Sequence, residues 1–89
     1  ILLRPDDIYF FEVTDKTVHI KTINKDYSSA NSLSYFEAKL QNSSFYRCHR
    51  SYLVNLDKVS RFVYYSKSLC ELGFSDIRET ALVSKNNIA

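Results

Sequence analysis

The amino-acid sequence predicts a small, mainly β domain, with mostly antiparallel strands in small sheets and one short α-helix. Two observations indicate this fold class: most apolar residues lie in short stretches that alternate or are rich in aromatic and β-branched side chains, and a single stretch has helical spacing. The chain has 89 residues, of which 45% are hydrophobic, enough for one core and too few for two. We therefore expect residues 1–89 to form a single domain.

The first segment of the chain predicts a three-stranded antiparallel meander. Residues 9–13 are rich in aromatic and β-branched side chains, and residues 17–23 alternate, which places Val18 on one face of the strand and His19 on the other. Short polar connections of hairpin length follow each of these stretches, and a third strand is expected from Tyr27.

The next stretch, residues 31–40, predicts the helix. Its apolar residues fall at helical spacing, and Ser34 with Glu37 fits a capping box. We expect about two to three turns from this spacing.

The second half of the chain predicts further short strands. The single glycine leaves most turns to Asn, Asp and Ser, which hydrogen-bond nearby backbone. An irregular connection is expected after Cys48, because the residues that follow show neither period. The expected strands are Phe45–Cys48, Val59–Tyr65, Leu69–Phe74 and Thr80–Val83.

Charge is distributed unevenly along the chain, although the formal net charge is only +2. Residues 1–44 carry five basic and six acidic side chains, whereas residues 45–89 carry seven basic and four acidic ones. Cations interleaved with aromatic residues could bind nucleic-acid phosphates. Alternatively, Arg47 and Arg61 lie over apolar neighbours or pair with Asp57. The most basic stretch, here called the basic segment, contains Arg47, Arg50, Lys58 and Arg61.

The sequence does not predict an enzyme, a metal site or a cofactor. One glycine cannot build a phosphate-binding loop or a G-x-S-x-G motif. The adjacent Cys48 and His49 do not suit a nucleophile and its base, because neighbouring side chains rarely meet. Together with His19 and Cys70 they also lack the spacing of a zinc site.

The sequence also predicts a cytoplasmic protein that does not contact a membrane. No apolar stretch approaches the roughly 18 residues that a membrane-spanning helix needs. The absence of methionine predicts that the chain is a domain of a longer protein.

The run from Phe45 to Leu56 resembles the signature of the LytTR DNA-binding domain, the output module of many bacterial response regulators. The residues that carry the resemblance are Phe45, Arg47, Cys48, His49, Arg50, Ser51, Tyr52, Val54, Asn55 and Leu56. Ile8–Glu12, Ser32–Leu33 and Val83–Ser84 also stand where the family has them. The cysteine at position 48 is similar to that of peptide-pheromone and virulence regulators of Gram-positive bacteria.

This resemblance implies a mostly antiparallel β fold with one short helix, and sequence-specific binding of double-stranded DNA by a transcriptional regulator. It implies that loops enter successive major grooves, and that two copies bind promoter direct repeats as a homodimer. It further implies a two-component system in which an upstream receiver domain controls this C-terminal domain, with a role in virulence or quorum sensing.

The resemblance also places candidate DNA contacts by position. The first loop brings Lys16, Val18 and His19 near the DNA, and Arg50, just after His49, holds a base-contacting place. A guanidinium there can donate two hydrogen bonds to guanine. The third segment consists of Ser84, Lys85 and Asn86, and its candidate contacts are Lys85 and Asn86.

Several of these side chains have alternative roles. His49 and Ser51 either contact DNA or fix the turn through hydrogen bonds. Arg47 suits a phosphate contact or an internal salt bridge better than base recognition. Lys85 suits a phosphate contact. Asn86 could bind adenine, and Asn55 is expected to hydrogen-bond backbone in a turn.

The thiols and the aromatic strands carry two further hypotheses. Arg47 and His49 could lower the pKa of Cys48 if its thiol is exposed, which would make Cys48 and Cys70 redox-active; the alternative is buried packing. A protein-interaction module that dimerises through the strand edges Tyr9–Phe11 or Tyr64–Tyr65 is the alternative to DNA binding.

Overall fold

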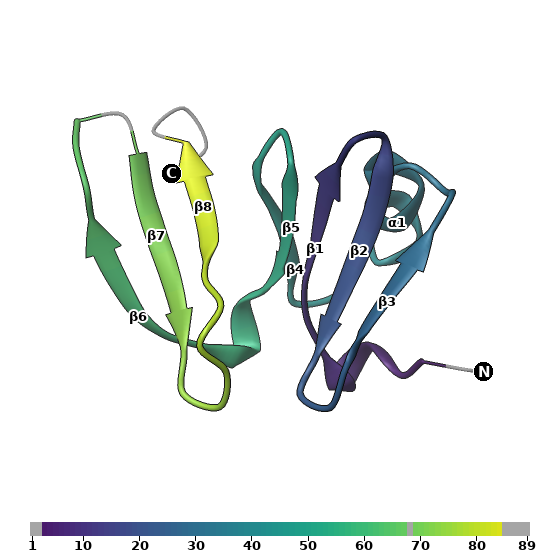
Figure 1. Cartoon of the computed structure of the whole chain (residues 1–89), viewed down its shortest axis with the longest axis horizontal. Helices are drawn as coiled ribbons and strands as arrows, with labels where there is room; N and C mark the ends of the chain where they lie inside the picture. Colours follow the sequence, from purple (N-terminus) through teal and green to yellow (C-terminus); the bar gives the residue numbers. More distant parts are fainter. Residues whose placement is uncertain (1–2, 68, 85–89) are drawn as a thin grey trace.

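The computed structural model describes residues 3–67 and 69–84. Within this part of the chain, two antiparallel sheets and one α-helix form the domain (Figure 1). The strands are β1 (Ile8–Thr14), β2 (Thr17–Thr22), β3 (Asp26–Ser29), β4 (Phe45–His49), β5 (Tyr52–Asn55), β6 (Val59–Tyr64), β7 (Leu69–Phe74) and β8 (Ala81–Ser84). The helices are η1 (Pro5–Asp7), α1 (Leu33–Lys39) and η2 (Leu56–Lys58), of which η1 and η2 are 3-10 helices.

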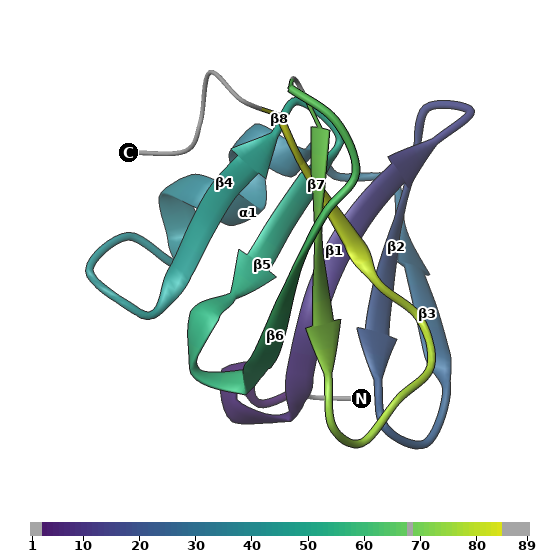
Figure 2. The same ribbon diagram turned by 90° about the vertical axis from the view of Figure 1, so that its left-hand side faces the viewer.

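The larger sheet lies in the middle of the molecule. Its five strands have the order β3-β2-β1-β5-β4, and the smaller sheet has the order β6-β7-β8. Helix α1 covers one face of the larger sheet and the smaller sheet packs on the other (Figures 1 and 2). The predicted fold class is therefore confirmed.

Apolar side chains fill both interfaces. On the helix side, the rings of Phe11 and Phe36 stack with centroids 4.7 Å apart, and Leu33 and Leu53 belong to the same cluster. On the other side, the ring of Phe10 stacks on Phe74, 5.7 Å between centroids. Because β1 is covered on both faces, its residues form a continuous apolar run instead of an alternating one.

Strand β2 was predicted well, because one of its faces is buried and the other is not. Val18 and Ile20 are buried in the core, whereas His19 and Lys21 are half-buried on the other face. The strands predicted from Tyr27 and at residues 80–83 are also present, as β3 and β8.

Strand β5 corrects the expected irregular connection after Cys48. Its four residues, Tyr52–Asn55, are all buried, since β5 lies inside the larger sheet between β1 and β4. A strand that is buried on both faces shows no period-2 pattern.

The capping box predicted at Ser34 and Glu37 was wrong. The N-cap is Ser32, whose hydroxyl accepts a hydrogen bond from the Tyr35 N–H at 3.0 Å. Ser32 has the extended backbone that an N-cap requires, whereas Ser34 already lies in the first helical turn. In the described part of the chain, no helix is long and apolar enough to cross a membrane.

Candidate nucleic-acid interface

Three segments that the sequence singled out gather at one end of the molecule. They are the β1–β2 turn (Asp15 and Lys16), the β4–β5 turn (Arg50 and Ser51) and the end of β8 at Ser84 (Figures 1 and 2). The backbone N–H of Val13 donates to the Ser51 carbonyl over 3.0 Å, which ties the first two turns together. We call this group of segments the turn edge.

The β1–β2 turn presents Lys16 to solvent. Asp15 has a φ of 51° and Lys16 a φ of 65°, so both central residues are left-handed. Two consecutive positive φ values suit a two-residue hairpin of type I′, whose twist matches that of the flanking strands. Both side chains are exposed, which leaves the ammonium group of Lys16 available at the turn edge.

The two strand residues that follow this turn differ in what they can contact. Val18 is only 1% exposed and packs in the helix-side core, so the expectation that Val18 lies near DNA was wrong. His19 lies on the opposite face of β2, half-buried, opposite Glu12 and Ser28 in the neighbouring strands. Strand alternation therefore keeps only His19 as a candidate.

The β4–β5 turn presents Arg50. Its side chain is exposed, and within the described residues its guanidinium makes no hydrogen bond or ion pair. The other cations of the basic segment are engaged. Lys58 places its ammonium nitrogen 5.1 Å from the centre of the Tyr9 ring, and Arg61 donates to the Phe74 carbonyl over 3.2 Å.

Arg47 forms an internal salt bridge, one of its two predicted roles. Its Nη1 lies 2.9 Å from Oε1 of Glu37 on α1, and not near Asp57 as the sequence suggested. Its Nε donates to the His49 carbonyl over 3.1 Å, and its Nη2 donates to the Arg50 carbonyl over 2.6 Å. Arg47 therefore contacts the backbone of the turn that carries Arg50.

His49 and Ser51 contact each other inside this turn. The Ser51 N–H donates to Nδ1 of His49 over 3.0 Å, so the ring nitrogen that accepts carries no proton. Burial lowers the pKa of His49 below its ordinary value, and the positive charges of Arg50 and Arg47 lower it further. Both conditions favour the neutral ring, and they match the turn-fixing role that the sequence left open for these two residues.

The two thiols are buried. Cys48 donates from Sγ to the Leu82 carbonyl over 3.3 Å, and burial raises its pKa to about 12. The thiol is not exposed, so the alternative of buried packing holds: Arg47 lowers the pKa of Cys48, but the loss of solvation raises it by more. Cys70 is also buried, and both cysteines are free thiols in the core between the two sheets.

Asn55 has the predicted structural role. Its side-chain amide donates to the Ile8 carbonyl over 3.0 Å, and its Oδ1 accepts from the Asp57 N–H over 3.1 Å as the N-cap of η2. The predicted contacts Lys85 and Asn86 lie outside the described residues.

Sequence reasoning missed two side chains that support the turn edge. Glu37 was assigned to helix capping and instead pairs with Arg47. Tyr52 donates its hydroxyl proton to Oε2 of Glu12 over 2.8 Å. This bond joins the start of β5, next to the β4–β5 turn, to the end of β1, next to the β1–β2 turn. The sequence indicated only that Glu37 lies on an exposed face of the helix, and this position does not identify Arg47 as its partner.

Comparisons with known proteins agree on one family. The family model of the LytTr DNA-binding domain matches residues 1–89. The chain is similar to the transcriptional regulatory protein YpdB of Escherichia coli K12, with 30% identity over 99% of this chain and 36% of YpdB. It is also similar to the transcriptional regulatory protein NatR of Bacillus subtilis, with 25% identity over 98% of this chain and 37% of NatR. The chain thus spans little more than a third of these two curated relatives.

A solved structure shows the same arrangement of strands. It is a LytTr DNA-binding domain from Bacillus cereus, with a TM-score of 0.87 and 26% identity over 98% of this chain and 79% of that one.

Proposed function

This chain belongs to the LytTr DNA-binding domain family, and from this premise we propose that it recognises a specific double-stranded DNA sequence with its turn edge. The family is one of DNA-binding domains of transcriptional regulators and not of enzymes. The proposal concerns which residues bind DNA and how they do so.

The observation that carries this proposal is the state of Arg50. Among the described residues, it is the one cation of the basic segment whose side chain is exposed and unengaged. It projects from a two-residue turn between β4 and β5, and a two-stranded ribbon fits the major groove of B-DNA. A guanidinium that donates two hydrogen bonds to guanine contributes about 1–3 kcal/mol of discrimination.

Lys16 and His19 complete the proposed surface at the neighbouring turn. Lys16 suits a phosphate contact, because an ammonium on a flexible stem is a point charge without the geometry of a base-specific fork. His49, Ser51 and Arg47 support the turn in this proposal. Lys85 and Asn86, which follow β8 in the sequence, remain predicted DNA contacts.

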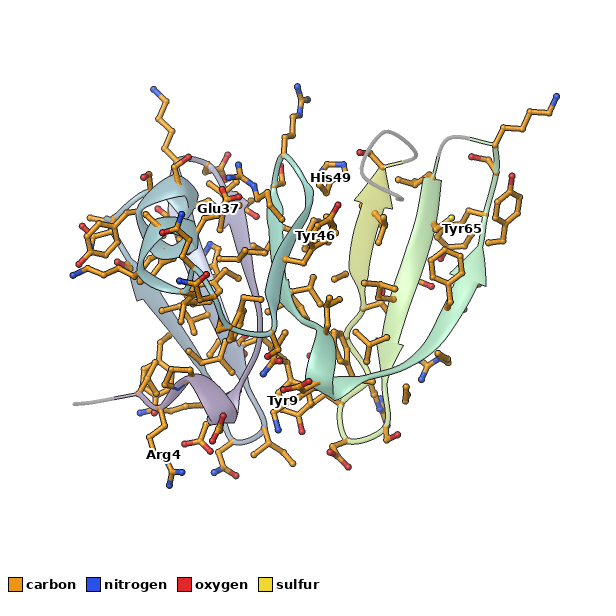
Figure 3. The ribbon with its side chains drawn as sticks, turned by 180° about the vertical axis from the view of Figure 1, so that it is seen from behind. Arg4, Tyr9, Glu37, Tyr46, His49 and Tyr65 are labelled. Atoms are coloured by element: carbon orange, nitrogen blue, oxygen red, sulfur yellow. The ribbon has the colours of Figure 1, made fainter. Side chains whose placement is uncertain are left out.

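The wider setting is also proposed. Residues 1–89 form one domain, the C-terminal part of a cytoplasmic response regulator whose receiver domain precedes it. Two copies bind direct repeats in a promoter as a homodimer, with a role in virulence or quorum sensing. Arg4 and His49 lie at opposite ends of the molecule, so Arg4 is far from the turn edge (Figure 3).

A second candidate function is protein interaction through β6. This strand pairs with β7 alone, and Tyr64 and Tyr65 are 66% and 59% exposed. The other predicted edge, Tyr9–Phe11, was wrong, because β1 lies inside the larger sheet and these residues are buried. An aromatic interface would be insensitive to salt, whereas DNA binding weakens steeply as ionic strength rises.

The test is a selection of duplexes from a random-sequence library, followed by binding measurements on the enriched duplex and a scrambled one. We expect Arg50→Ala to weaken binding of the enriched duplex by about tenfold to a hundredfold. Arg78→Ala is the matched control, since Arg78 is an exposed arginine in the β7–β8 connection at the opposite end (Figure 1). Wild-type binding by Arg50→Ala would show that the assigned surface is wrong.

A further inference from the structure

Arg47 and Glu37 lie beside the turn that carries Arg50, and we propose that they form a positioning pair, holding this turn for DNA binding without touching DNA. Helix α1 then contributes to DNA affinity through Glu37. This inference rests on the proposed function, because it assumes that Arg50 contacts the bases.

The backbone of the β4–β5 turn lacks the left-handed residues that stabilise a two-residue hairpin turn. In the described residues, positive φ values occur at Asp15, Lys16 and Asn42, and therefore at neither Arg50 nor Ser51. Two-residue hairpin turns without left-handed residues do not match the twist of the strands and tend to splay them. The register between β4 and β5 is also irregular between Arg47 and His49. Other contacts must therefore hold the turn.

Arg47 supplies such contacts. Its guanidinium donates to the carbonyls of His49 and Arg50, over 3.1 and 2.6 Å, while its Nη1 lies 2.9 Å from Glu37. One planar group thus joins two consecutive carbonyls of the turn to a carboxylate on α1. His49 and Glu37 lie on opposite sides of this turn (Figure 3), and the imidazole of His49 accepts a hydrogen bond from the Ser51 N–H.

Strand geometry explains why Arg47 meets the helix. Arg47 lies opposite Leu53 in the sheet, and Leu53 packs in the helix-side core. Its neighbour Cys48 packs in the core on the other face. Since β4 is the edge strand next to α1, the side chain of Arg47 reaches Glu37, which projects from the exposed side of the helix.

A phosphate contact by Arg47 either uses the donors that these bonds leave over or replaces the bonds. A guanidinium has five N–H donors, and Arg47 uses three of them internally, one on Nε and one on each Nη. Turning towards DNA would leave the two turn carbonyls and Glu37 without this partner. Positioning and phosphate binding therefore predict different results for the same variants.

Glu37→Gln gives the sharpest test, because the two explanations differ in sign. Removing a negative charge near the turn edge should tighten DNA binding if Glu37 acts only through its charge. A positioning pair predicts weaker binding of the enriched duplex, by about threefold to tenfold, with an unchanged salt slope and with binding of the scrambled duplex as tight as that of wild type or tighter. Fluorescence anisotropy with both duplexes, over a range of salt concentrations, measures all of these quantities.

Asp15→Asn is the control for charge. Asp15 is exposed at the turn edge, makes no side-chain bond in the described residues, and asparagine tolerates its positive φ. Because removal of its charge acts without regard to sequence, Asp15→Asn should tighten binding of the enriched and the scrambled duplex alike, which Glu37→Gln should not do.

Arg47→Lys distinguishes a role of the positive charge from a role of the planar guanidinium group. A phosphate contact would survive this change, whereas an ammonium cannot reproduce three bonds in one plane. We expect Arg47→Lys to weaken binding as much as Glu37→Gln does, and the double variant to be no weaker than Arg47→Lys alone. Thermal unfolding followed by circular dichroism shows whether each variant is folded; if Arg47→Lys is not, Glu37→Gln decides alone.

The outcomes separate the two proposals. Wild-type or tighter binding by Glu37→Gln overturns the positioning pair, provided that Arg50→Ala loses binding of the enriched duplex. If Arg50→Ala binds like wild type, the proposed DNA surface itself is wrong, and the positioning pair is wrong with it.

Discussion

The β1–β2 and β4–β5 turns lie next to each other at the turn edge, but different parts of the chain hold them. Left-handed backbone at Asp15 and Lys16 shapes the first turn, and no side-chain hydrogen bond spans it in the described residues. Side chains shape the second, through Arg47 and His49. The side chains around the β4–β5 turn fix the backbone from which Arg50 projects, as recognition of a DNA base requires. The β1–β2 turn lacks such support, and a phosphate contact by Lys16 needs only its charge.

The largest effect expected from this comparison is that of Arg50→Lys. The charge is kept, so binding of a scrambled duplex should change little, whereas the two-pronged contact to guanine is lost. We expect the preference for the enriched duplex over the scrambled one to fall by about tenfold to a hundredfold. The ratio of the two dissociation constants measures this preference. An unchanged ratio would show that Arg50 acts as a charge alone, like Lys16.

A smaller effect is expected from the titration of His49. Its pKa lies below the ordinary value of 6.5, because burial disfavours the charged ring. The unfolded chain therefore binds the proton more readily. The stability that neutral His49 provides is fully present above about pH 6.5, and it is lost as the pH falls through the folded-state pKa.

The variant His49→Asn isolates this effect. Its side-chain oxygen can replace Nδ1 as the acceptor for the Ser51 N–H, but it does not titrate. As the pH falls from about 8 to about 5, the free energy of unfolding of wild type should fall relative to that of the variant. Urea unfolding at a series of pH values measures the difference, and parallel curves would show that folding does not lower the pKa of His49.

The smallest effect on DNA binding is expected for Lys16→Gly. This variant should bind DNA more weakly but be more stable than wild type. Glycine adopts the positive φ at position 16 without steric cost, so the free energy of unfolding should rise by about 1 kcal/mol. Loss of one phosphate contact should weaken binding equally for all sequences and reduce the salt slope by about 1. Denaturant unfolding and salt titrations check the two parts. A change in sequence preference would contradict the role of this turn as an unspecific charge.

Sequence patterns predicted the parts of the fold that have one buried face. The alternation of residues 17–22 gave β2 and correctly placed His19 away from the core. The pattern failed at Tyr52–Asn55, because both faces of β5 are covered and all four residues are buried. Local rules also misplaced the helix cap, since both Ser32 and Ser34 have the required chemistry and only the backbone conformation distinguishes them.

The described residues proposed to bind DNA lie together at the turn edge, but the contacts that several of them make inside the protein were predicted only in part. Their positions in the resemblance to the family gave Arg50 and the neighbouring His49 as candidate DNA contacts. The partner of Arg47 could not be predicted, because Asp57 is closer in the sequence but Glu37 is brought near by the packing of α1 on the sheet. The state of Cys48 depended on burial, which the adjacent charges did not reveal.

The only glycine of the chain, Gly73, lies under a neighbouring side chain instead of forming a turn. A Cβ at this position would collide with the guanidinium of Arg61, which crosses the strand to reach the Phe74 carbonyl. Any larger residue at 73 would displace Arg61 and break this bond. Over evolutionary time the two positions are therefore expected to change together, so that related sequences without this glycine also lack the arginine.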